Sequence, residues 1–220
     1  MKRYLPFFIV AIVGLVTVAS AIILYRAKRS PASGVLRQPA GDQSRNIAHV
    51  RGPVDAPVTL EEFGDFQCPP CGRIAGAISQ IAHDYQPHLR VIFRNFPFAI
   101  HLHAHEAALA AEAAGLQGHF WEMHDLLYRE QPAWSAAPDA QLLFERYAGV
   151  LGLDIDRFKR DMQSNETRAR VAADQQRGSS LGVTTTPSIF INNQPVSPRS
   201  LNNSGLRAAI DAAIKARPTG

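Results

Sequence analysis

The chain has 220 residues, of which 46% are hydrophobic and 19% charged, a balance typical of a folded globular protein and not of a disordered one. The formal net charge of +4 is concentrated at the N-terminus, because residues 1–30 contain five basic and no acidic residues and the rest of the chain carries −1. Binding to nucleic acid is therefore not expected.

The first stretch of the chain predicts a membrane anchor. Residues 5–24 are almost entirely apolar, and a helix of that length, at about 1.5 Å per residue, crosses the roughly 30 Å of hydrocarbon in a bilayer. The alternative is a removable signal peptide, because Ala19-Ser20-Ala21 has the small-x-small form of a cleavage site. Apolar residues continue past that site, so we favour an N-terminal transmembrane helix within residues 1–29.

Residues 30–48 predict a flexible linker, since they are rich in proline, glycine, serine and other polar residues without an apolar period. The remaining residues, 49–220, are numerous enough for one well-buried core. They contain no internal repeat or low-complexity tract, so we expect a single folded domain.

The domain begins with a predicted strand, helix and strand, continues with several helices, and ends with a hairpin and a helix. Alternating apolar residues indicate strands, and apolar residues three or four positions apart indicate helices. The expected elements are a strand at 58–63, a helix at 69–85, a strand at 89–94, a hairpin at 188–196 and a helix at 201–215. Residues 103–182 are expected to form several helices, separated by breaks at 115–118, 132–138, 149–153 and near 165. The hairpin turn falls at Asn192-Asn193, because asparagine tolerates the positive φ of such turns. This order of elements predicts an α/β fold.

Cys68 and Cys71 are the only cysteines of the chain, and they lie where the first predicted strand gives way to a helix. A disulfide that closes so short a loop adds little stability, so a structural role is a weak reason for the pair. A structural zinc site needs four ligands and would have to take two histidines from elsewhere. The spacing therefore predicts a redox-active dithiol and no metal site.

The start of the helix gives the two cysteines different expected roles. Thiolates rather than thiols attack disulfides, and a helix N-terminus stabilises a thiolate with unpaired amides and partial positive charge. Cys68 occupies that place, so we expect it to be the exposed nucleophile, and Cys71, one turn deeper, to be the resolving thiol. Pro69 suits the first helical position, where a missing amide costs no helical hydrogen bond.

Three blocks of the sequence resemble the DsbA-type thiol-disulfide oxidoreductases of the thioredoxin superfamily. The likeness extends from about residue 54 to the C-terminus, and its blocks are 56–63 with 65–71, then 120–125, then 182–192. It implies a thioredoxin-like fold with an all-helical insertion at about 100–180. It also implies a protein disulfide oxidoreductase that needs no cofactor.

The resemblance assigns further site residues. The Thr186–Pro187 peptide bond is expected to be cis and to pack against the dithiol, where the backbone of Thr186 pairs with an extended substrate. Glu62 is the expected buried acid that serves proton transfer at the inner thiol, and it shares a strand face with Leu60, where a carboxylate without a partner is costly. Glu61 lies on the opposite face, and the alternative is that one of the two glutamates is simply exposed on a sheet edge.

Pro70 departs from the strongly oxidising relatives, in which this residue can contribute a backbone amide, and sometimes an imidazole, to the nucleophilic thiolate. Both donors are absent here. The pKa of this thiolate ranges from about 7 to about 3.5 within the fold, and a lower pKa accompanies a more oxidising disulfide. The active-site loop Pro69-Pro70 therefore predicts a reduction potential nearer the middle of the range than its oxidising end.

Three histidines, His101, His103 and His105, suggest a metal site without supporting one. In a helix that begins near residue 102, His101 and His105 share a side while His103 points elsewhere, so a surface or cap role is favoured. His124 is expected at the edge of the core of the helical insertion.

Several functions are open to such a dithiol. We favour an oxidase that acts as a monomer, donates its disulfide to exported cysteine-containing proteins and is restored by a membrane redox partner. A reductase runs the exchange in reverse, and an isomerase is ranked third because a linker stands where such enzymes usually carry a dimerisation module. A copper-binding protein is an alternative of a different class, since Cu(I) is satisfied by few sulfur ligands.

The expected location combines the dithiol with the N-terminal segment. Basic residues flank both ends of the apolar stretch, so charge alone does not orient it. A redox dithiol behind an export-type N-terminus fits an oxidising compartment. We therefore expect a single-pass protein of the cytoplasmic membrane with its catalytic domain on the periplasmic side.

Overall fold

The computed structural model describes residues 49–216, which contain the dithiol and every predicted strand. The predicted membrane anchor at 1–29 and the linker at 30–48 lie outside the described residues. Within 49–216, no helix combines the length and the apolar character needed to cross a membrane.

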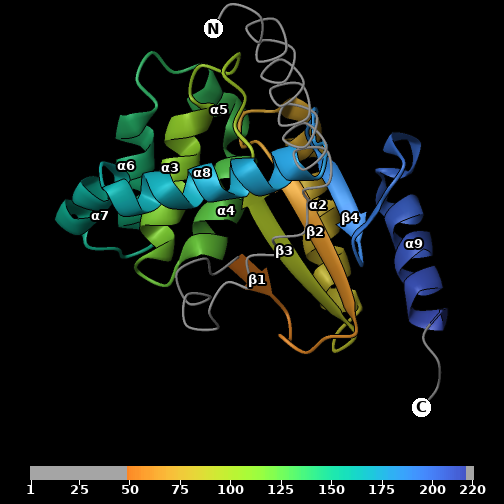
Figure 1. Ribbon diagram of the computed structural model, residues 1–220. Helices are drawn as coiled ribbons and strands as arrows, with labels where there is room; N and C mark the ends of the chain where they lie inside the picture. The colour runs from red at the N-terminus through yellow and green to blue at the C-terminus, as the bar shows by residue number, and fades with distance from the viewer. Residues whose placement is uncertain (1–48, 217–220) are drawn as a thin grey trace, which may run out of the picture. The chain divides into compact units, whose positions relative to one another are not determined.

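A five-stranded mixed sheet, with the order β1-β3-β2-β4-β5, forms the centre of the fold (Figure 1). Its strands are β1 (His49–Arg51), β2 (Val58–Gly64), β3 (Leu89–Asn95), β4 (Ser188–Ile191) and β5 (Gln194–Pro195). β2 runs parallel to β3 on one side and antiparallel to β4 on the other. β2 is therefore a central strand, and both of its faces are available for burial.

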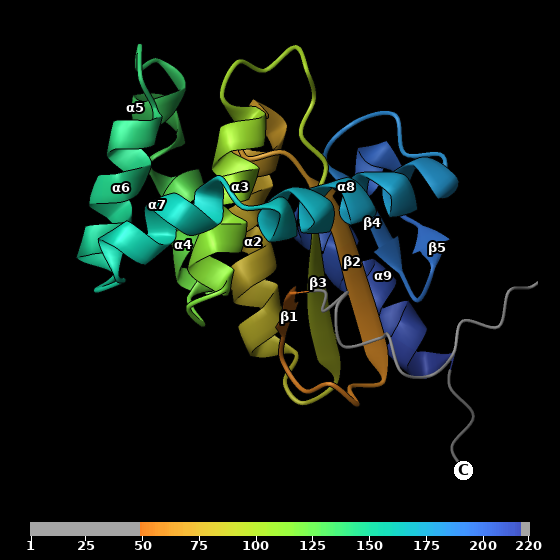
Figure 2. The same cartoon turned by 60° about the vertical axis from the view of Figure 1, so that its left-hand side comes forward.

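The helices form two groups. α2 (Pro69–Asp84) and α9 (Asn203–Lys215), the latter preceded by the short 3-10 helix η1 (Pro198–Ser200), pack with the strands around one apolar core. The second group lies between β3 and β4 in the chain and consists of α3 (Ala104–Gly115), α4 (Phe120–Arg129), α5 (Gln131–Ser135), α6 (Gln141–Val150), α7 (Ile155–Met162) and α8 (Asn165–Ser180). Figure 2 shows α8 crossing in front of the sheet and α9 behind it. The second group is the predicted helical insertion.

The core beneath α2 and α9 follows from the alternation in the strands. Leu60 of β2, Val91 of β3 and Ile189 of β4 point to the same face and are buried. They meet Ile78 and Ile81 of α2, which lie three positions apart on one side of the helix. Full burial of an aliphatic side chain of this size contributes about 1.5–3 kcal/mol, so this face fixes the helix that carries the dithiol.

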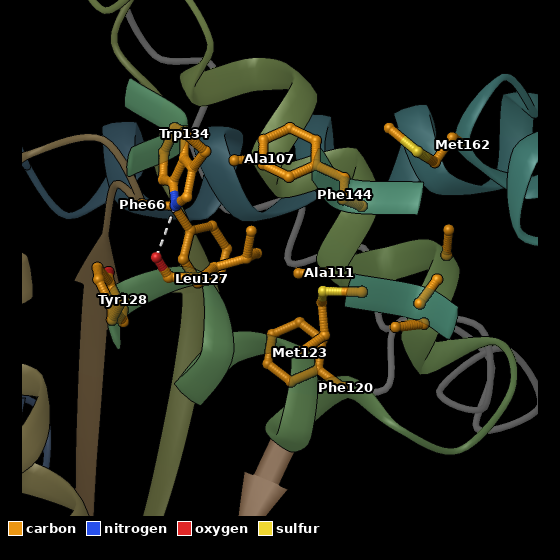
Figure 3. Close-up of a cluster of buried hydrophobic side chains, with 14 of the residues drawn as sticks. Phe66, Ala107, Ala111, Phe120, Met123, Leu127, Tyr128, Trp134, Phe144 and Met162 are labelled. Atoms are coloured by element: carbon orange, nitrogen blue, oxygen red, sulfur yellow. Dashed lines mark hydrogen bonds between the residues drawn. The ribbon is translucent and has the colours of Figure 1, made fainter. Parts of the chain in front are cut away.

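The helical insertion has a core of its own, shown in Figure 3. Trp134 and Phe144 are both 0% exposed and pack edge to face, and the indole N–H of Trp134 donates to the carbonyl of Leu127 at 2.7 Å. Phe66 and Cys71 belong to the same cluster of buried residues. The insertion therefore packs directly against the turn that carries the cysteines.

Local sequence patterns predicted most of these elements. The predicted hairpin turn is confirmed, with φ values of 48° at Asn192 and 65° at Asn193. β1 was not predicted, because a strand of three residues is too short to show an alternation. α5 lies where Pro132 and its neighbours predicted a break, since this proline falls in the first turn, where a helix tolerates the missing amide.

Candidate active site

The turn that follows β2 places Cys68 at the start of α2. Cys68 is the N-cap residue, with extended backbone angles, and its carbonyl accepts a hydrogen bond from the amide of Gly72 at 3.2 Å. Its own amide donates to the carbonyl of Asp65 at 3.0 Å. Pro69 and Pro70 follow in the first turn, and both are exposed. The predicted position of Cys68 at a helix N-terminus is confirmed.

Cys68 is more accessible than Cys71 but far less exposed than expected. Cys68 retains 6% exposure against 0% for Cys71, and both are free thiols. The loop before β4 covers the outer sulfur: in the protonated form of Cys68, Sγ donates to the carbonyl of Thr186 at 3.3 Å. The expected cis bond between Thr186 and Pro187 is confirmed. The expectation of an openly exposed nucleophile was wrong, since local sequence does not show what a loop 118 residues away covers.

The two thiols differ sharply in ionisation. A hydrogen bond with the Cys71 thiol lowers the pKa of Cys68 to about 6 against the opposing effect of burial, and Thr186 and the amide of Cys71 lower it further. Burial raises the pKa of Cys71 far above its usual value, and the hydrogen bond with Cys68 and the charge of Glu62 add to this. At neutral pH the outer sulfur is therefore mostly a thiolate and the inner one a thiol.

Glu62 lies on β2 in the environment of the inner thiol. It is 2% exposed, and among the described residues its Oε1 has no hydrogen-bond partner. Burial raises the pKa of Glu62 to about 8, and the charge of Cys68 contributes in the same direction. The carboxyl therefore carries a proton at neutral pH, as a buried acid without a cation does.

Tyr128 of α4 belongs to the same environment and was missed by the sequence analysis. Within residues 49–216 its buried hydroxyl has no hydrogen-bond partner. Figure 3 shows the ring at the edge of the insertion core, and its centroid lies 5.0 Å from that of Phe66. Burial raises the pKa of Tyr128 well above its usual value, and the charges of Cys71 and Glu62 raise it further. No pattern marked this residue, because a tyrosine on an amphipathic helix is usually a packing residue.

Glu61 does not lie exposed on a sheet edge, which corrects the alternative drawn from the sequence. It is 3% exposed, Arg94 donates to its Oε1 at 2.9 Å, and Arg177 donates to both of its oxygens at 2.6 and 2.7 Å. Burial alone would raise the pKa of Glu61, but the hydrogen bonds from Arg177 and Arg94 outweigh it and lower the value. Both glutamates are buried because β2 is a central strand.

Asp65 fixes the turn between β2 and α2, and the sequence analysis did not assign it a role. The side chain is 1% exposed, and its oxygens accept from the amide of Gln67 at 2.7 Å and the amide of Phe98 at 2.9 Å. Nδ1 of His101 lies 2.7 Å from Oδ2. An aspartate that binds an amide two residues later is a known turn signal, so this residue could have been found from its place before Cys68.

Two glutamines join the same turn to the helical insertion, and neither was predicted. Nε2 of Gln131, in α5, donates to the carbonyls of Phe66 at 2.6 Å and Cys68 at 3.0 Å. In the opposite sense, Oε1 of Gln67 accepts from the amide of His103 at 2.6 Å. Contacts between a side chain and a distant backbone leave no periodic pattern in the sequence.

Two adjoining cavities flank the cis-proline. One, of about 480 Å³, is lined on one side by Pro70 and Ile74 and on the other by Pro187 and Leu201. The second, of about 250 Å³, shares Pro187 and Leu201 with the first and extends along β4. Both are lined by Pro187, which follows Thr186, the residue whose carbonyl contacts Sγ of Cys68.

The three histidines do not converge. His101 binds Asp65, His103 is buried with Nε2 at 3.0 Å from the carbonyl of Ala137, and His105 is exposed. His103 occupies the N-cap position of α3, but its side chain makes no capping hydrogen bond, so the favoured cap role is not supported. In the part of the chain that the structure describes, no three His, Cys, Asp or Glu side chains are grouped so that they could hold a metal ion.

Comparisons with solved structures agree on this architecture. A thioredoxin-like oxidoreductase from Silicibacter pomeroyi is 30% identical, with a TM-score of 0.65, and the match covers 77% of this chain and 94% of that one. The oxidised BdbD of Bacillus subtilis is 24% identical with a TM-score of 0.69, covering 76% and 93%. At 24% identity, the second likeness concerns the fold alone.

Sequence relatives include the Na(+)/H(+) antiporter NhaA 1 of Salinispora arenicola, 41% identical over 167 residues, and NhaA 3 of Salinispora tropica, 39% identical over 177 residues. The matches take in 76% and 78% of this chain but 24% and 26% of those longer proteins. The family model described as thioredoxin matches residues 45–212. The chain therefore belongs to the thioredoxin family and is a DsbA-like thiol-disulfide oxidoreductase with the pair Cys68 and Cys71.

Proposed function

We propose that the protein is an oxidase that donates its Cys68–Cys71 disulfide to cysteine-containing proteins exported from the cytoplasm. The observation that carries the proposal is the lowered pKa of Cys68, about 6, for which the hydrogen bond with Cys71 is the main cause. A stabilised thiolate stabilises the reduced pair, so the disulfide form gives up its bond more readily. A reductase would instead benefit from a less stable thiolate at Cys68, because its reduced pair would then give up electrons more readily.

The exchange proceeds in two displacements. A substrate thiolate attacks Sγ of Cys68, and Cys71 leaves with the electron pair of the broken S–S bond. A second substrate thiolate attacks the substrate sulfur of the mixed disulfide and displaces Cys68 as a thiolate. The substrate loses two electrons and gains a disulfide, while the pair Cys68 and Cys71 gains the two electrons.

Glu62 supplies the proton that the leaving Cys71 needs. The pKa of Cys71 is raised mainly by burial, so this sulfur leaves poorly as a bare thiolate. Burial raises the pKa of Glu62 to about 8, so its carboxyl holds a proton at neutral pH. The charge of Glu62 influences the pKa of Cys71, so the two groups lie in one buried environment. Positioned acids of this kind contribute about 10²–10⁴ to a rate.

Thr186 and Pro187 bind the substrate. The carbonyl of Thr186 already faces Sγ of Cys68 at 3.3 Å, and Pro187 lines both cavities beside it. An approaching peptide that pairs with the backbone of Thr186 would displace this contact and uncover the sulfur. Strand addition of this kind gives affinity without demanding one sequence, which suits an enzyme with many substrates.

The cellular setting of the proposal comes from the sequence. The apolar stretch at 5–24 anchors the protein in the cytoplasmic membrane, with the catalytic domain on the periplasmic side. The protein acts as a monomer there, and a membrane redox partner reoxidises the pair after each turnover. Pro69 and Pro70 leave the thiolate fewer amide donors, which places the potential below that of the strongest oxidases.

The direction of exchange is tested by equilibrating the protein with glutathione buffers and by trapping its redox state in cells with an alkylating agent. We expect a potential between about −270 mV, typical of thioredoxin, and about −120 mV, typical of DsbA. The pair should be trapped mostly oxidised. A pair found mostly reduced in cells would replace the oxidase with a reductase.

Two cysteine variants test the assigned roles. Cys68→Ser should abolish exchange with reduced model proteins, because no outer sulfur remains to form the mixed disulfide. Cys71→Ser should instead accumulate mixed disulfides at Cys68, because the resolving thiol is missing. Mixed disulfides that form at Cys71 in the Cys68→Ser variant would reverse the assignment.

A further inference from the structure

Gln131 reaches the catalytic turn from outside the thioredoxin core. It is the first residue of the short helix α5 in the helical insertion. Its side-chain amide donates to two carbonyls of the turn, that of Phe66 at 2.6 Å and that of Cys68 at 3.0 Å. One side chain thus holds the backbone on both sides of Gln67 and directly at the nucleophile.

The approach is tight on the helix side as well. A Cβ atom placed on Gly72, in the first turn of α2, would lie 2.6 Å from Oε1 of Gln131. That separation is below any ordinary contact, so a side chain at position 72 would push the glutamine away. The missing side chain of Gly72 and the length of Gln131 are matched to each other.

Gln131 fixes the orientation of the Cys68 peptide, and this orientation keeps the amide of Cys71 beside the thiolate. Pro69 and Pro70 carry no N–H, so the amide of Cys71 is the first donor that α2 offers to Sγ of Cys68. A rotation of the Cys68 peptide would turn this rigid pair of prolines and carry that amide away from the sulfur. Gln131 opposes the rotation by holding the carbonyl of Cys68.

A reciprocal contact shows that the turn is fixed against the insertion from two sides. Gln67 accepts the amide of His103 at 2.6 Å, and its Nε2 lies 3.5 Å from the carbonyl of Ser135, at the end of α5. The segment from Phe66 to Cys68 is therefore held by α5 and by the start of α3.

We propose that Gln131 is a positioning residue through which the helical insertion holds the Cys68 turn and keeps the nucleophilic sulfur against the amide of Cys71. The role applies to either direction of disulfide exchange. It therefore stands or falls separately from the choice between oxidase and reductase.

The first test replaces the glutamine. Gln131→Leu keeps most of the volume and removes both donated hydrogen bonds, so the pKa of Cys68 should rise by about half to one unit, a shift of the size of one ordinary hydrogen bond. Ultraviolet absorbance of the thiolate across a pH titration measures it. The control is Gln117→Leu, because Gln117 also binds backbone, through the carbonyl and amide of Asp154, but in another part of the insertion.

The second test moves the glutamine without changing it. Gly72→Ala should displace Gln131 and raise the pKa of Cys68 in the same direction, whereas Gly76→Ala, in the same helix, places its Cβ where nothing lies within 4 Å and should leave the pKa unchanged. This pair keeps the proposal testable if Gln131→Leu folds poorly.

The outcomes separate positioning from mere stabilisation. A positioning role predicts a raised pKa together with about a two- to fivefold weaker tendency to be reduced by glutathione, in folded Gln131→Leu and Gly72→Ala but in neither control. A lowered melting temperature with an unchanged Cys68 pKa in both variants would overturn the proposal. So would equal pKa shifts in the variants and their controls.

Discussion

Two adjacent glutamates on β2 meet opposite environments on the two faces of the sheet. Glu61 faces α8, where Arg94 and Arg177 both donate to its carboxylate. Glu62 faces α2 and the dithiol, where its Oε1 has no hydrogen-bond partner among residues 49–216. The two carboxyls differ in exposure by one percentage point, 3% against 2%, so burial does not distinguish them.

The presence of partners distinguishes them. Burial pushes the pKa of both glutamates upwards, but two guanidinium groups reverse the effect at Glu61, while nothing reverses it at Glu62, whose pKa reaches about 8. A paired carboxylate is permanently charged and serves the structure. An unpaired one keeps an exchangeable proton near neutral pH, which is what the buried thiol of Cys71 requires.

Other carboxylates near α8 also have partners, although burial still raises the pKa of Asp174. Asp174 of α8 accepts from Arg94 at 2.9 Å and from the amide of Asn95 at 3.0 Å, and Glu112 of α3 accepts from the side chain of Asn95 at 2.7 Å. Each of these carboxylates lies against a donor. The ion pairs on this face therefore help to anchor α8 to the sheet, whereas Glu62, on the other face, has no hydrogen-bond partner for its Oε1 among the described residues.

The largest effect is expected from replacing Glu61, the glutamate that has partners. Glu61→Leu removes the carboxylate that Arg94 and Arg177 share. Arg94 keeps Asp174 and Arg177 is partly exposed, so we expect a loss of about 2–3 kcal/mol of the free energy of unfolding. Denaturant unfolding measures the change. Glu62→Leu is the matched control at the next position, and we expect it to be neutral or stabilising. Equal losses in the two variants would contradict the contrast between the faces.

The next effect is a dependence of stability on pH. The carboxyl of Glu62 has a pKa of about 8 in the folded protein against 4.5 for the ordinary side chain. Below pH 4.5 the carboxyl is protonated in both the folded and the unfolded protein, and its contribution to stability is fully present. Above pH 4.5 the unfolded protein loses this proton while the folded protein keeps it, so the free energy of unfolding falls as the pH rises towards about 8.

The comparison of wild type with Glu62→Gln isolates this contribution. Between pH 5 and pH 7 the wild type should lose about 2.5 kcal/mol relative to the variant, because one proton is worth about 1.4 kcal/mol per pH unit once the unfolded state has ionised. Denaturant unfolding at each pH checks the slope. A constant difference across this range would show that Glu62 ionises normally in the folded state.

A smaller effect, on rate, follows from the same proton. Glu62→Gln removes the acid that we propose protonates Cys71, so exchange with a reduced model protein should slow by about tenfold or more at neutral pH. The pH profile of the rate should also lose its step near 8, where the pKa of Glu62 is raised by burial. Glu61→Gln serves as the control and should leave the profile unchanged, even where it lowers stability.

The smallest effect concerns Tyr128. Its buried hydroxyl has no partner among the described residues, so Tyr128→Phe should be neutral or stabilise the protein by up to about 1 kcal/mol. Denaturant unfolding again measures the change. A loss of more than about 1 kcal/mol would mean that the hydroxyl has a hydrogen-bond partner, for example a buried water that also reaches Glu62.

Residues close together in the chain made the central features predictable. The alternation in β2, the helical spacing in α2 and the two cysteines between them were sufficient to predict where Cys68 lies and which sulfur is outermost. The same holds for the hairpin, because Asn192 and Asn193 carry their conformational preference with them. Such features depend on local backbone geometry, which neighbouring residues dictate.

Contacts between distant segments were decided by the tertiary structure. Thr186 covers Cys68 across 118 residues, Arg177 neutralises Glu61 across 116, and Gln131 binds the carbonyl of Cys68 across 63. Each contact joins a side chain or loop to a distant partner, and no periodic pattern in the sequence predicts that partner. The sequence determined the dithiol and the strand and helix that hold it, because propensity and spacing are local. The packing of distant segments, including the loop before β4 and the helical insertion, determined the exposure of the dithiol and the ionisation of the groups around it.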